Sequence, residues 1–472
     1  MSVVVFSNGA LLMVLGVLMA ADAMIFPATW SDFVLSALVS CFAGCLLCLT
    51  VTHRLNDFRR VHAFLLTGTI WITGATAGAL PLWSSHLSFT DAFFEAMSGI
   101  TTTGSTVMTG LDTMEPGILL WRAVLQWIGG IGFIVTGIAF LPILRIGGMQ
   151  LFRTESSERG DKEMASAARF AATTVWVYAA LTAICAATYR IGGMSPLEAV
   201  VHAFTTLSTG GYSTSDSSFG HFQSPFLQWA GTVFMAAGAL PFAWYIRALN
   251  GGGFRSEQVK GLMILFAAAT LILTAWRMFT AGSPFFETLR LVAFNVVSVV
   301  TTTGFATTDY TTWGPFATTM FLVLTALGGC TGSTAGGAKT MRWIVVMRAL
   351  RAQIKAVHSP SVTTTIKYEG RTINQDVLSG VITFFFLYTV TVAVLATGVG
   401  MFGPDLETSI SGVLTAVANV GPGIGDTIGP AGNFSSLPDG AKWLLSFGMY
   451  AGRLELLTVL VLLTPGFWVE AA

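Results

Sequence analysis

The segment FEAMSGITTTGST at residues 94–106 recurs almost position for position as FNVVSVVTTTGFA at residues 294–306. Phe, Ser, three Thr and Gly fall at identical spacing in the two segments. Related endings occur in TTLSTGGYST at residues 205–214 and in LTAVANVGPGIG at residues 414–425. Because the four segments lie at regular intervals, the chain repeats one structural unit four times. Each unit is predicted to be a span, a short amphipathic helix, a glycine-containing loop and a second span.

The composition indicates where these units lie. Of the 472 residues, 53% are hydrophobic and only 10% are charged. A soluble chain carries roughly 25% charged residues, so most of this surface must face lipid. A helix that crosses a membrane needs about 20 mostly apolar residues. By that measure we predict ten spans, at residues 3–21, 31–52, 62–82, 117–144, 172–190, 225–246, 259–280, 314–347, 378–402 and 440–465.

Positive charge alternates between the two sides of these spans. Most of the 24 Lys and Arg residues fall in connections that share one side if there are ten spans. The positive-inside rule makes that side cytoplasmic and places both termini there. Two basic connections on it, residues 145–170 and 348–371, are either docking surfaces for a partner or topology signals alone. The formal net charge is zero, so no nucleic-acid partner is expected.

The four glycine-containing loops lie on the opposite, outer side. Irregular backbone at membrane depth is tolerated only inside protein or against water. Four extended Thr-x-Gly segments around an axis would form a cage of carbonyl oxygens that can replace a cation's hydration shell. None of their side chains is charged, which suits a monovalent ion. The predicted filter residues are Thr102, Thr103, Gly104, Ser208, Thr209, Gly210, Thr302, Thr303, Gly304, Asn419, Val420 and Gly421.

Two segments carry a resemblance to a known family. GGCTGSTAGGAKTMR at residues 328–342 and NVGPGIG at residues 419–425 are similar to segments of the TrkH/TrkG/KtrB superfamily of potassium transporters. The resemblance covers essentially the whole chain, and the two leading spans favour the TrkH type. It implies that Gly104, Gly210, Gly304 and Gly421 are the filter glycines, with K⁺ held at the filter's backbone carbonyls. Relatives that prefer Na⁺ have Ser at the first filter glycine, so Gly104 implies K⁺; the second repeat departs from TTTG but keeps its glycine.

The same resemblance implies partners and a location. It predicts a homodimer, a cytoplasmic ring of TrkA-type nucleotide-binding regulatory subunits, and a multi-pass protein of the bacterial cytoplasmic (inner) membrane in contact with its lipids. A nucleotide is expected only on the partner subunit. The transported K⁺ is the only ion expected on this chain.

The closing span of the third repeat cannot be a plain helix. Each interior glycine costs about 1 kcal/mol of helix stability relative to Ala, and five lie between residues 328 and 339. The unwound segment must therefore line the aqueous pore. It is not a phosphate-binding loop, because Ala338 separates Gly337 from Lys339 and a membrane span precedes it. In the resembled family this segment obstructs the pore below the filter. The predicted gate residues are Gly328, Gly329, Gly332, Ser333, Gly336, Gly337, Lys339 and Arg453.

Arg453 is expected in the middle of the last span. A lone arginine at the centre of a bilayer costs about 2.5–3.5 kcal/mol, so it is functional by default. Counting residues inward from the outer ends of two helices places Arg453 and the glycine-rich loop at one level, just inside the filter. There its charge would oppose cation passage while loop carbonyls accept its donors. The alternative is a structural ion pair with Glu455, or packing alone.

We therefore predict an all-α polytopic membrane protein with four parallel repeats around a pseudo-fourfold pore. The predicted divisions are two extra helices at 1–56, then repeats at 57–150, 165–250, 256–355 and 372–472. The predicted function is K⁺ uptake through a selective, gated pore, and the alternative is a K⁺ symporter coupled to H⁺ or Na⁺. A membrane-embedded enzyme is remote, because no nucleophile–base pair or paired carboxylates lie at depth. Cys41, Cys45 and Cys48 fall on one helix face and are expected to pack rather than bind metal.

Overall fold

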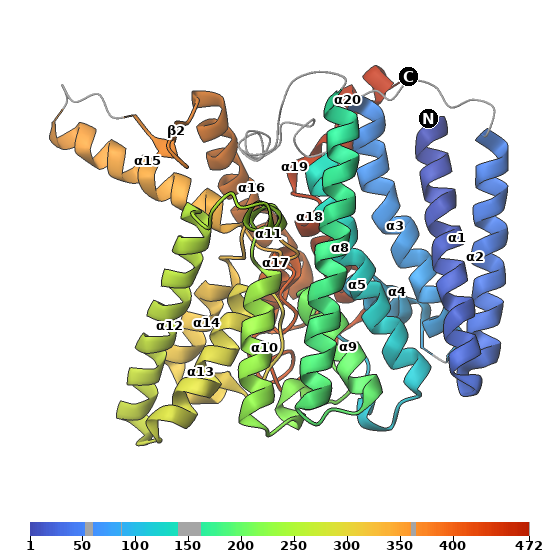
Figure 1. Cartoon of the computed structure of the whole chain (residues 1–472), viewed down its shortest axis with the longest axis horizontal. Coiled ribbons are helices and arrows are strands. Elements are labelled where there is room, and N and C mark those ends of the chain that lie inside the picture. The colour runs from blue at the N-terminus through green and yellow to red at the C-terminus, as the bar shows by residue number, and fades with distance from the viewer. Residues whose placement is uncertain (52–59, 86, 140–161, 360–364, 472) are drawn as a thin grey trace.

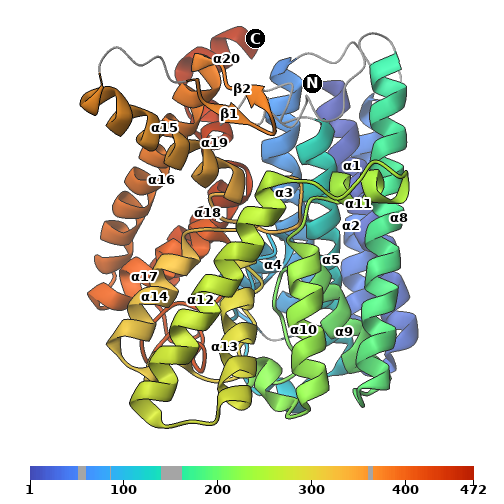
Figure 2. The same cartoon turned by 60° about the vertical axis from the view of Figure 1, so that its left-hand side comes forward.

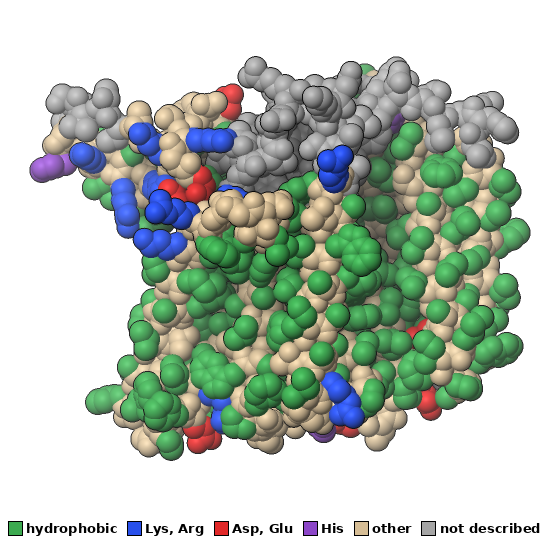
Figure 3. Space-filling model, in the orientation of Figure 1, with side chains coloured by type: hydrophobic (Ala, Val, Ile, Leu, Met, Phe, Trp, Pro, Cys, Tyr) green, Lys and Arg blue, Asp and Glu red, His purple; other side chains and the backbone are tan. Residues whose placement is uncertain are grey.

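Long helices run roughly parallel through the computed structural model, which describes residues 1–51, 60–85, 87–139, 162–359 and 365–471 (Figure 1). Within those residues, seven helices are long and apolar enough to cross a membrane, and a bent helix pair would make an eighth crossing if it counts as one span. Figure 3 shows a broad band of hydrophobic side chains, with Lys and Arg gathered mainly at the end that carries α15. The protein is therefore a multi-pass membrane protein, as the composition predicts.

Two helices precede the repeats and lie at one edge of the molecule (Figure 1). They are α1 (Ser2–Ile25) and α2 (Trp30–Val51), joined by a 3-10 turn at Pro27–Thr29. They pack closely through small residues, because a β-carbon at Gly9 or Gly44 would lie within 3 Å of the other helix's backbone. Val4 and Phe467 belong to one hydrophobic cluster, which brings the two ends of the chain to the same face.

Four repeats follow, each built of a long helix, a short helix, a loop and a closing helix. The first comprises α3 (Arg60–Ser84), α4 (Phe89–Ile100) and α5 (Pro116–Ala139). The second comprises α8 (Lys162–Ile191), α9 (Pro196–Leu207), α10 (Pro225–Gly238) and α11 (Phe242–Leu249). The third comprises α12 (Glu257–Ala281), α13 (Phe285–Val300), α14 (Pro315–Thr325) and α15 (Thr340–His358). The fourth comprises α16 (Gln375–Gly400), α17 (Leu406–Ala418), α18 (Asp439–Arg453), α19 (Leu457–Leu462) and α20 (Pro465–Ala471).

Outside these helices the regular structure is small. Three 3-10 turns, Leu111–Thr113, Ser218–His221 and Tyr310–Trp313, lie between a loop and its closing helix. A two-stranded antiparallel hairpin, β1 (Lys367–Tyr368) and β2 (Arg371–Thr372), pairs Lys367 with Thr372 between the third and fourth repeats. Figure 2 shows this hairpin beside α15, at the end of the molecule that carries both termini.

Local sequence explains where three of the four short helices begin. Ser88 accepts a hydrogen bond from the Asp91 amide at the start of α4, and Asp405 accepts one from the Thr408 amide at the start of α17. Ser195 and Glu198 form a reciprocal capping box at the start of α9. Such caps satisfy amides that a helix leaves without partners, at about 1 kcal/mol each. Lys442 of α18 pairs with Asp91 at 2.6 Å, and this ion pair joins repeat four back to repeat one.

Over the residues that the structure describes, three of the four closing helices are interrupted, and the sequence predicted only one of these breaks. The predicted span 225–246 is two helices, α10 and α11, at 91° to each other; Pro241, which lacks an amide proton, lies at the break. The predicted span 440–465 divides into α18 and α19, with Glu455 at a φ of 63° between them. In the third repeat the chain unwinds between α14 and α15, where the glycines predicted a break.

Candidate functional site

The loops that follow the four short helices share one backbone conformation. Each contains a residue in the left-handed region, with φ from 52° to 58°, followed two positions later by a glycine with φ from 76° to 112°. Between these two lies a residue whose amide donates to a carbonyl in the last turn of its short helix, at 2.8–3.0 Å. The four triplets are Thr102-Thr103-Gly104, Thr209-Gly210-Gly211, Thr302-Thr303-Gly304 and Asn419-Val420-Gly421.

This shared conformation corrects the predicted register of the second repeat. The sequence suggested Ser208, Thr209 and Gly210, with Gly210 as the filter glycine. In the structure Gly211 has the positive φ that Gly104 has, whereas Gly210 does not. Ser208 is the residue that closes α9. The prediction was wrong by one position, because two adjacent glycines look alike in a sequence and only backbone geometry separates them.

The four triplets form a closed ring in which each glycine faces the carbonyl oxygen of the next repeat. A β-carbon at Gly104 would lie 2.1 Å from the Gly210 oxygen, and one at Gly211 would lie 1.8 Å from the Thr303 oxygen. The remaining contacts are Gly304 with the Val420 oxygen at 2.0 Å and Gly421 with the Thr103 oxygen at 2.9 Å. No side chain fits at such distances, and positive φ disfavours one as well. At these four positions the ring is therefore formed by backbone, with no room for a side chain between one repeat and the next.

A buried ion pair stabilises two of the loops that form the ring. Arg122 Nε lies 2.8 Å from Glu95 Oε1, and both side chains are fully buried. Glu95 also accepts the Val107 amide at 2.9 Å, while Arg122 donates to the Ser213 carbonyl at 3.2 Å and lies over the Tyr212 ring. A buried pair is tolerable only when further hydrogen bonds satisfy both partners. Here those bonds join the loop of repeat one to the loop of repeat two, a link that no local motif predicted.

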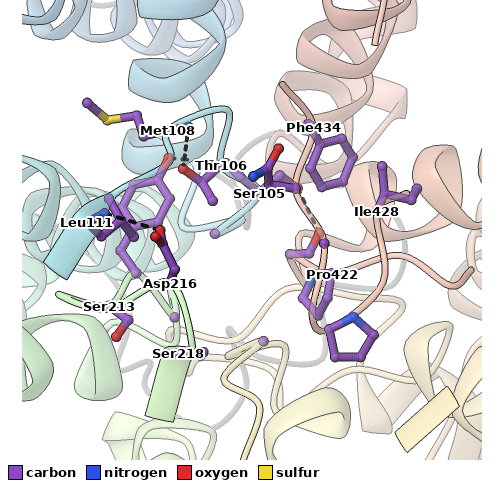
Figure 4. Close-up of a pocket in the computed structure, with 18 of the residues that line it drawn as sticks. Ser105, Thr106, Met108, Leu111, Ser213, Asp216, Ser218, Pro422, Ile428 and Phe434 are labelled. Atoms are coloured by element: carbon purple, nitrogen blue, oxygen red, sulfur yellow. Dashed lines mark hydrogen bonds between the residues drawn. The ribbon is translucent and has the colours of Figure 1, made fainter. Parts of the chain in front are cut away.

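An open cavity of about 260 Å³ lies on one side of the ring and is lined by its four glycines. Figure 4 shows Asp216 and Ser213 on one flank of this cavity and Pro422, Ile428 and Phe434 on the other. Asp216 does not face it as a free charge, because its oxygens accept the Gly110 and Leu111 amides at 2.9 and 3.2 Å. Nearby, a hydrogen bond from the Ser215 side chain holds the pKa of Asp112 below its ordinary value of 3.8.

On the opposite side of the ring, the unwound segment between α14 and α15 lies directly against the ring residues. The Gly336 amide donates to Thr302 Oγ1 at 2.6 Å, and the Gly337 amide donates to the Ala418 carbonyl at 2.8 Å. Thr334 Oγ1 donates to the carbonyls of Leu207 and Gly238, both at 2.9 Å. The segment thus contacts repeats two, three and four and sits beneath the ring.

The predicted gate residues in this segment each have a structural role. Gly328 and Gly337 have positive φ and approach so closely that a β-carbon on Gly328 would lie 2.8 Å from the Gly337 α-carbon. The Gly332 carbonyl accepts the Phe242 amide at the break in the second repeat, and the Gly329 carbonyl accepts the Thr340 amide. Ser333 bonds within the segment, to the Cys330 carbonyl.

Arg453 reaches this segment from the fourth repeat. It ends α18 rather than lying mid-helix, which corrects the prediction. Its Nη1 donates to the Thr334 carbonyl at 3.0 Å and its Nη2 to the Gly129 carbonyl at 3.4 Å. The guanidinium also lies 4.1 Å from the centre of the Phe133 ring. One side chain therefore touches repeats one and three.

The ion pair proposed as an alternative for Arg453 is formed by a different arginine. Glu455 pairs with Arg342, and both side chains are buried. Lys339, which precedes α15 at a φ of 66°, directs its ammonium to the Ala335 carbonyl and over the Phe133 ring. Three cationic side chains, those of Lys339, Arg342 and Arg453, therefore lie near one another on this side of the ring, and Glu455 pairs with Arg342.

A family model described as a cation transport protein, TrkH, matches residues 31–466. The chain belongs to the TrkH family. Trk system potassium uptake protein TrkI of Halomonas elongata is 50% identical over 86% of this chain and 83% of its own length. Trk system potassium uptake protein TrkH of the same organism is 35% identical over 93% and 92%. The crystal structure of the potassium transporter TrkH from Vibrio parahaemolyticus superimposes with a TM-score of 0.90 at 31% identity, covering 99% of both chains.

These matches confirm the resemblance inferred from the glycine-rich segments and the leading helices. They also confirm the fold class, because the TrkH structure covers nearly the whole of this helical chain. The family is one of transport proteins and not of enzymes. In this TrkH-family chain, the basic connection at 145–170 falls largely outside the described residues, as do residues 360–364 of the second one.

Proposed function

We propose that this chain takes up K⁺ through a selective, gated pore. The observation that carries the proposal is the closed ring of four backbone triplets, which has no charged side chain and no room for one. Carbonyl oxygens held in such a ring can replace the hydration shell of K⁺. The relatives named as potassium uptake proteins support this ion.

The gate is proposed to be the unwound segment at 328–339 together with Arg453. Its backbone lies directly against the ring, and the guanidinium holds it by the Thr334 carbonyl. A fixed positive charge at this level raises the energy of a cation that has just left the ring. Obstruction by the segment and repulsion by the charge of Arg453 would then both lower K⁺ flux.

The mode of transport is tested by measuring reversal potentials of the purified protein in lipid vesicles. A pore predicts a potential that follows the K⁺ gradient and ignores imposed H⁺ and Na⁺ gradients. A symporter predicts that an H⁺ or Na⁺ gradient alone drives K⁺ uphill. Parallel repeats, each with two crossings, favour the pore, because alternating access is commonly built on inverted repeats.

We further propose that the chain forms a homodimer in the bacterial cytoplasmic membrane and docks TrkA-type nucleotide-binding subunits on its inner face. The basic end of α15 supports this, since it carries Arg348, Arg351 and Lys355. Figure 3 shows Lys and Arg side chains gathered at that end of the molecule. The positive-inside rule makes that face, with both termini, cytoplasmic. Charge reversal at Arg348 and Arg351 should abolish co-purification of such a subunit. Nucleotide-independent transport in cells lacking any such subunit would show the partner to be dispensable.

A further inference from the structure

The middle residue of the second triplet is a glycine, although the backbone conformation at that position does not require one. The middle residue of the triplet is Thr103, Thr303 or Val420 in three repeats and Gly210 in the second. Gly210 does not have positive φ, so its backbone would accept a side chain. What excludes one is space, because a β-carbon there would lie 2.4 Å from Gln126 Cδ and 2.5 Å from its Oε1.

Gln126 belongs to α5, the closing helix of repeat one, and is fully buried. Its Nε2 donates to the Gly210 carbonyl at 2.7 Å, and its Oε1 accepts the Tyr212 amide at 3.1 Å. An amide nitrogen can only donate and an amide oxygen can only accept, so the two bonds fix the orientation of the carboxamide. Gln126 therefore holds the second triplet by its middle residue and by the residue that follows.

The loops of repeats one and three are held differently. Thr103 Oγ1 bonds to Thr101 Oγ1 at 2.8 Å, and Thr303 Oγ1 bonds to Thr301 Oγ1 at 2.8 Å. In these repeats the hydroxyl of the middle residue bonds within its own loop, and Thr103 Oγ1 also accepts a hydrogen bond from Asn419 Nδ2 of repeat four at 3.0 Å. The second repeat has no side chain with which to do so, and a neighbouring repeat supplies the anchor.

We propose that Gln126 determines the ion specificity of the filter by replacing the side chain that residue 210 lacks. This rests on the proposed function of the ring as a K⁺ filter. The Gly210 oxygen is one of the four ring carbonyls, since it faces Gly104 as the Thr303 oxygen faces Gly211. A donated hydrogen bond occupies one of its two lone pairs and fixes its direction, so Gln126 sets both the position and the field of one oxygen in four. It is a positioning residue, which acts on the ion through Gly210.

Removing the carboxamide without removing its volume tests this proposal. Gln126→Met keeps the side-chain length and has no group that can bond to Gly210 or Tyr212. Losing a buried hydrogen bond at one ring oxygen should lower the K⁺/Na⁺ permeability ratio by about tenfold. The ratio is read from reversal potentials of purified protein in vesicles. Gln228→Met is the matched control, because Gln228 is also buried but bonds to the Phe222 carbonyl, away from the ring, and it should keep the wild-type ratio.

A reciprocal exchange makes the test independent of any one variant's folding. Gly210→Thr alone should clash with Gln126 and fail, whereas Gly210→Thr with Gln126→Ala recreates the middle residue of repeats one and three and should recover discrimination lost in Gln126→Ala. A wild-type K⁺/Na⁺ ratio in folded Gln126→Met, or a double variant no more selective than Gln126→Ala, would overturn the proposal. The unmodified protein, measured in the same vesicles, separates failure of the Gln126 proposal from failure of the proposed function. If the unmodified protein does not discriminate K⁺ from Na⁺, the ring is not a K⁺ filter.

Discussion

Replacing Arg453 by alanine removes the side chain that joins the fourth repeat to the unwound segment beside the ring. In the structure its two terminal nitrogens donate to the Thr334 and Gly129 carbonyls, at 3.0 and 3.4 Å. The first bond holds the proposed gate, and the second fixes the guanidinium against repeat one. Alanine removes both bonds and the charge, so we expect Arg453→Ala to raise K⁺ flux.

The size of the increase follows from two contributions. A hydrogen bond from a charged donor is worth about 1.5–3 kcal/mol, and the bond to Thr334 is the shorter of the two. A unit charge about 6 Å from an ion contributes close to 3 kcal/mol at an effective dielectric constant of about 20. Each contribution alone corresponds to about tenfold to hundredfold. Because they share one side chain they are not additive, and we expect a rise of about a hundredfold.

The assay is ⁸⁶Rb⁺ or K⁺ flux into vesicles that contain the purified chain without any regulatory subunit. Arg453→Lys is the matched variant, since it keeps the charge but cannot span both carbonyls, and it should give an intermediate rise. Thermal unfolding and gel filtration report whether each variant is folded. Reduced flux in folded Arg453→Ala would refute the reasoning, because the arginine would then hold the helices together and not bar the ion.

Shortening the segment itself supplies a second approach to the same gate. Deleting residues 333–335 removes Thr334, with its bonds to Leu207 and Gly238, and leaves the ring residues intact. Flux should rise while discrimination against Na⁺ remains, since the filter lies outside this level. A deletion that lost K⁺/Na⁺ discrimination would show that the segment belongs to the filter.

The remaining predictions concern the ring and its support. We expect Gly104→Ser and Gly211→Ser each to lower K⁺/Na⁺ discrimination by about tenfold in competition flux assays. The reason is overpacking, which costs roughly 1–3 kcal/mol, because a β-carbon would lie 2.1 or 1.8 Å from a ring oxygen. Unchanged discrimination would place the filter elsewhere. Arg122→Met leaves Glu95 charged and buried, which costs about 3–5 kcal/mol, and should lower the melting temperature of the purified protein by several degrees. The pKa of Asp112 is lower in the folded protein than its ordinary value of 3.8. Its contribution to stability is therefore fully present above that ordinary value and is lost as pH falls through the folded pKa. Protection factors for the amides of the loop that contains Asp112, which are exchange rates corrected for the intrinsic pH dependence of exchange, should therefore match at pH 5 and pH 7 and fall only below about pH 4.

The features predictable from sequence were those set by local chemistry. Thr-Gly loops at matching positions identified the repeats, and five glycines in twelve residues identified the unwound segment. Caps such as Ser88 and Ser195 fix the starts of their short helices through neighbouring residues alone. In each case the residues that form the sequence pattern are also the residues that produce the structure, so a short stretch of chain is enough to predict it.

The features missed depend on contacts between repeats. The second-repeat register is seen in the positive φ of Gly211, which faces the Thr303 oxygen of another repeat. The end of α18 at Arg453 follows from the turn at Glu455, whose carboxylate pairs with Arg342 more than one hundred residues earlier. Hydropathy does not detect such partners, because the chain on either side of each break is equally apolar.

The breaks missed in the closing helices bear directly on how the proposed gate would open. The ring, our proposed filter, is built from four similar loops, but the closing helices that follow these loops differ. The helix α5 shows no break over its described length, α10 and α11 are sharply bent, and the third closing helix is unwound. The bend and the unwound segment are bonded to each other, through the Phe242 amide to the Gly332 carbonyl and the Cys330 amide to the Ala239 carbonyl. Moving the segment therefore requires that the bend gives way with it. The segment continues directly into α15, whose first amide, on Thr340, bonds back to the Gly329 carbonyl. On the proposed function, a partner that pulled on the basic end of α15 would act on the gate through this bond, while the ring, held separately by Gln126 and the Glu95–Arg122 pair, would keep its geometry.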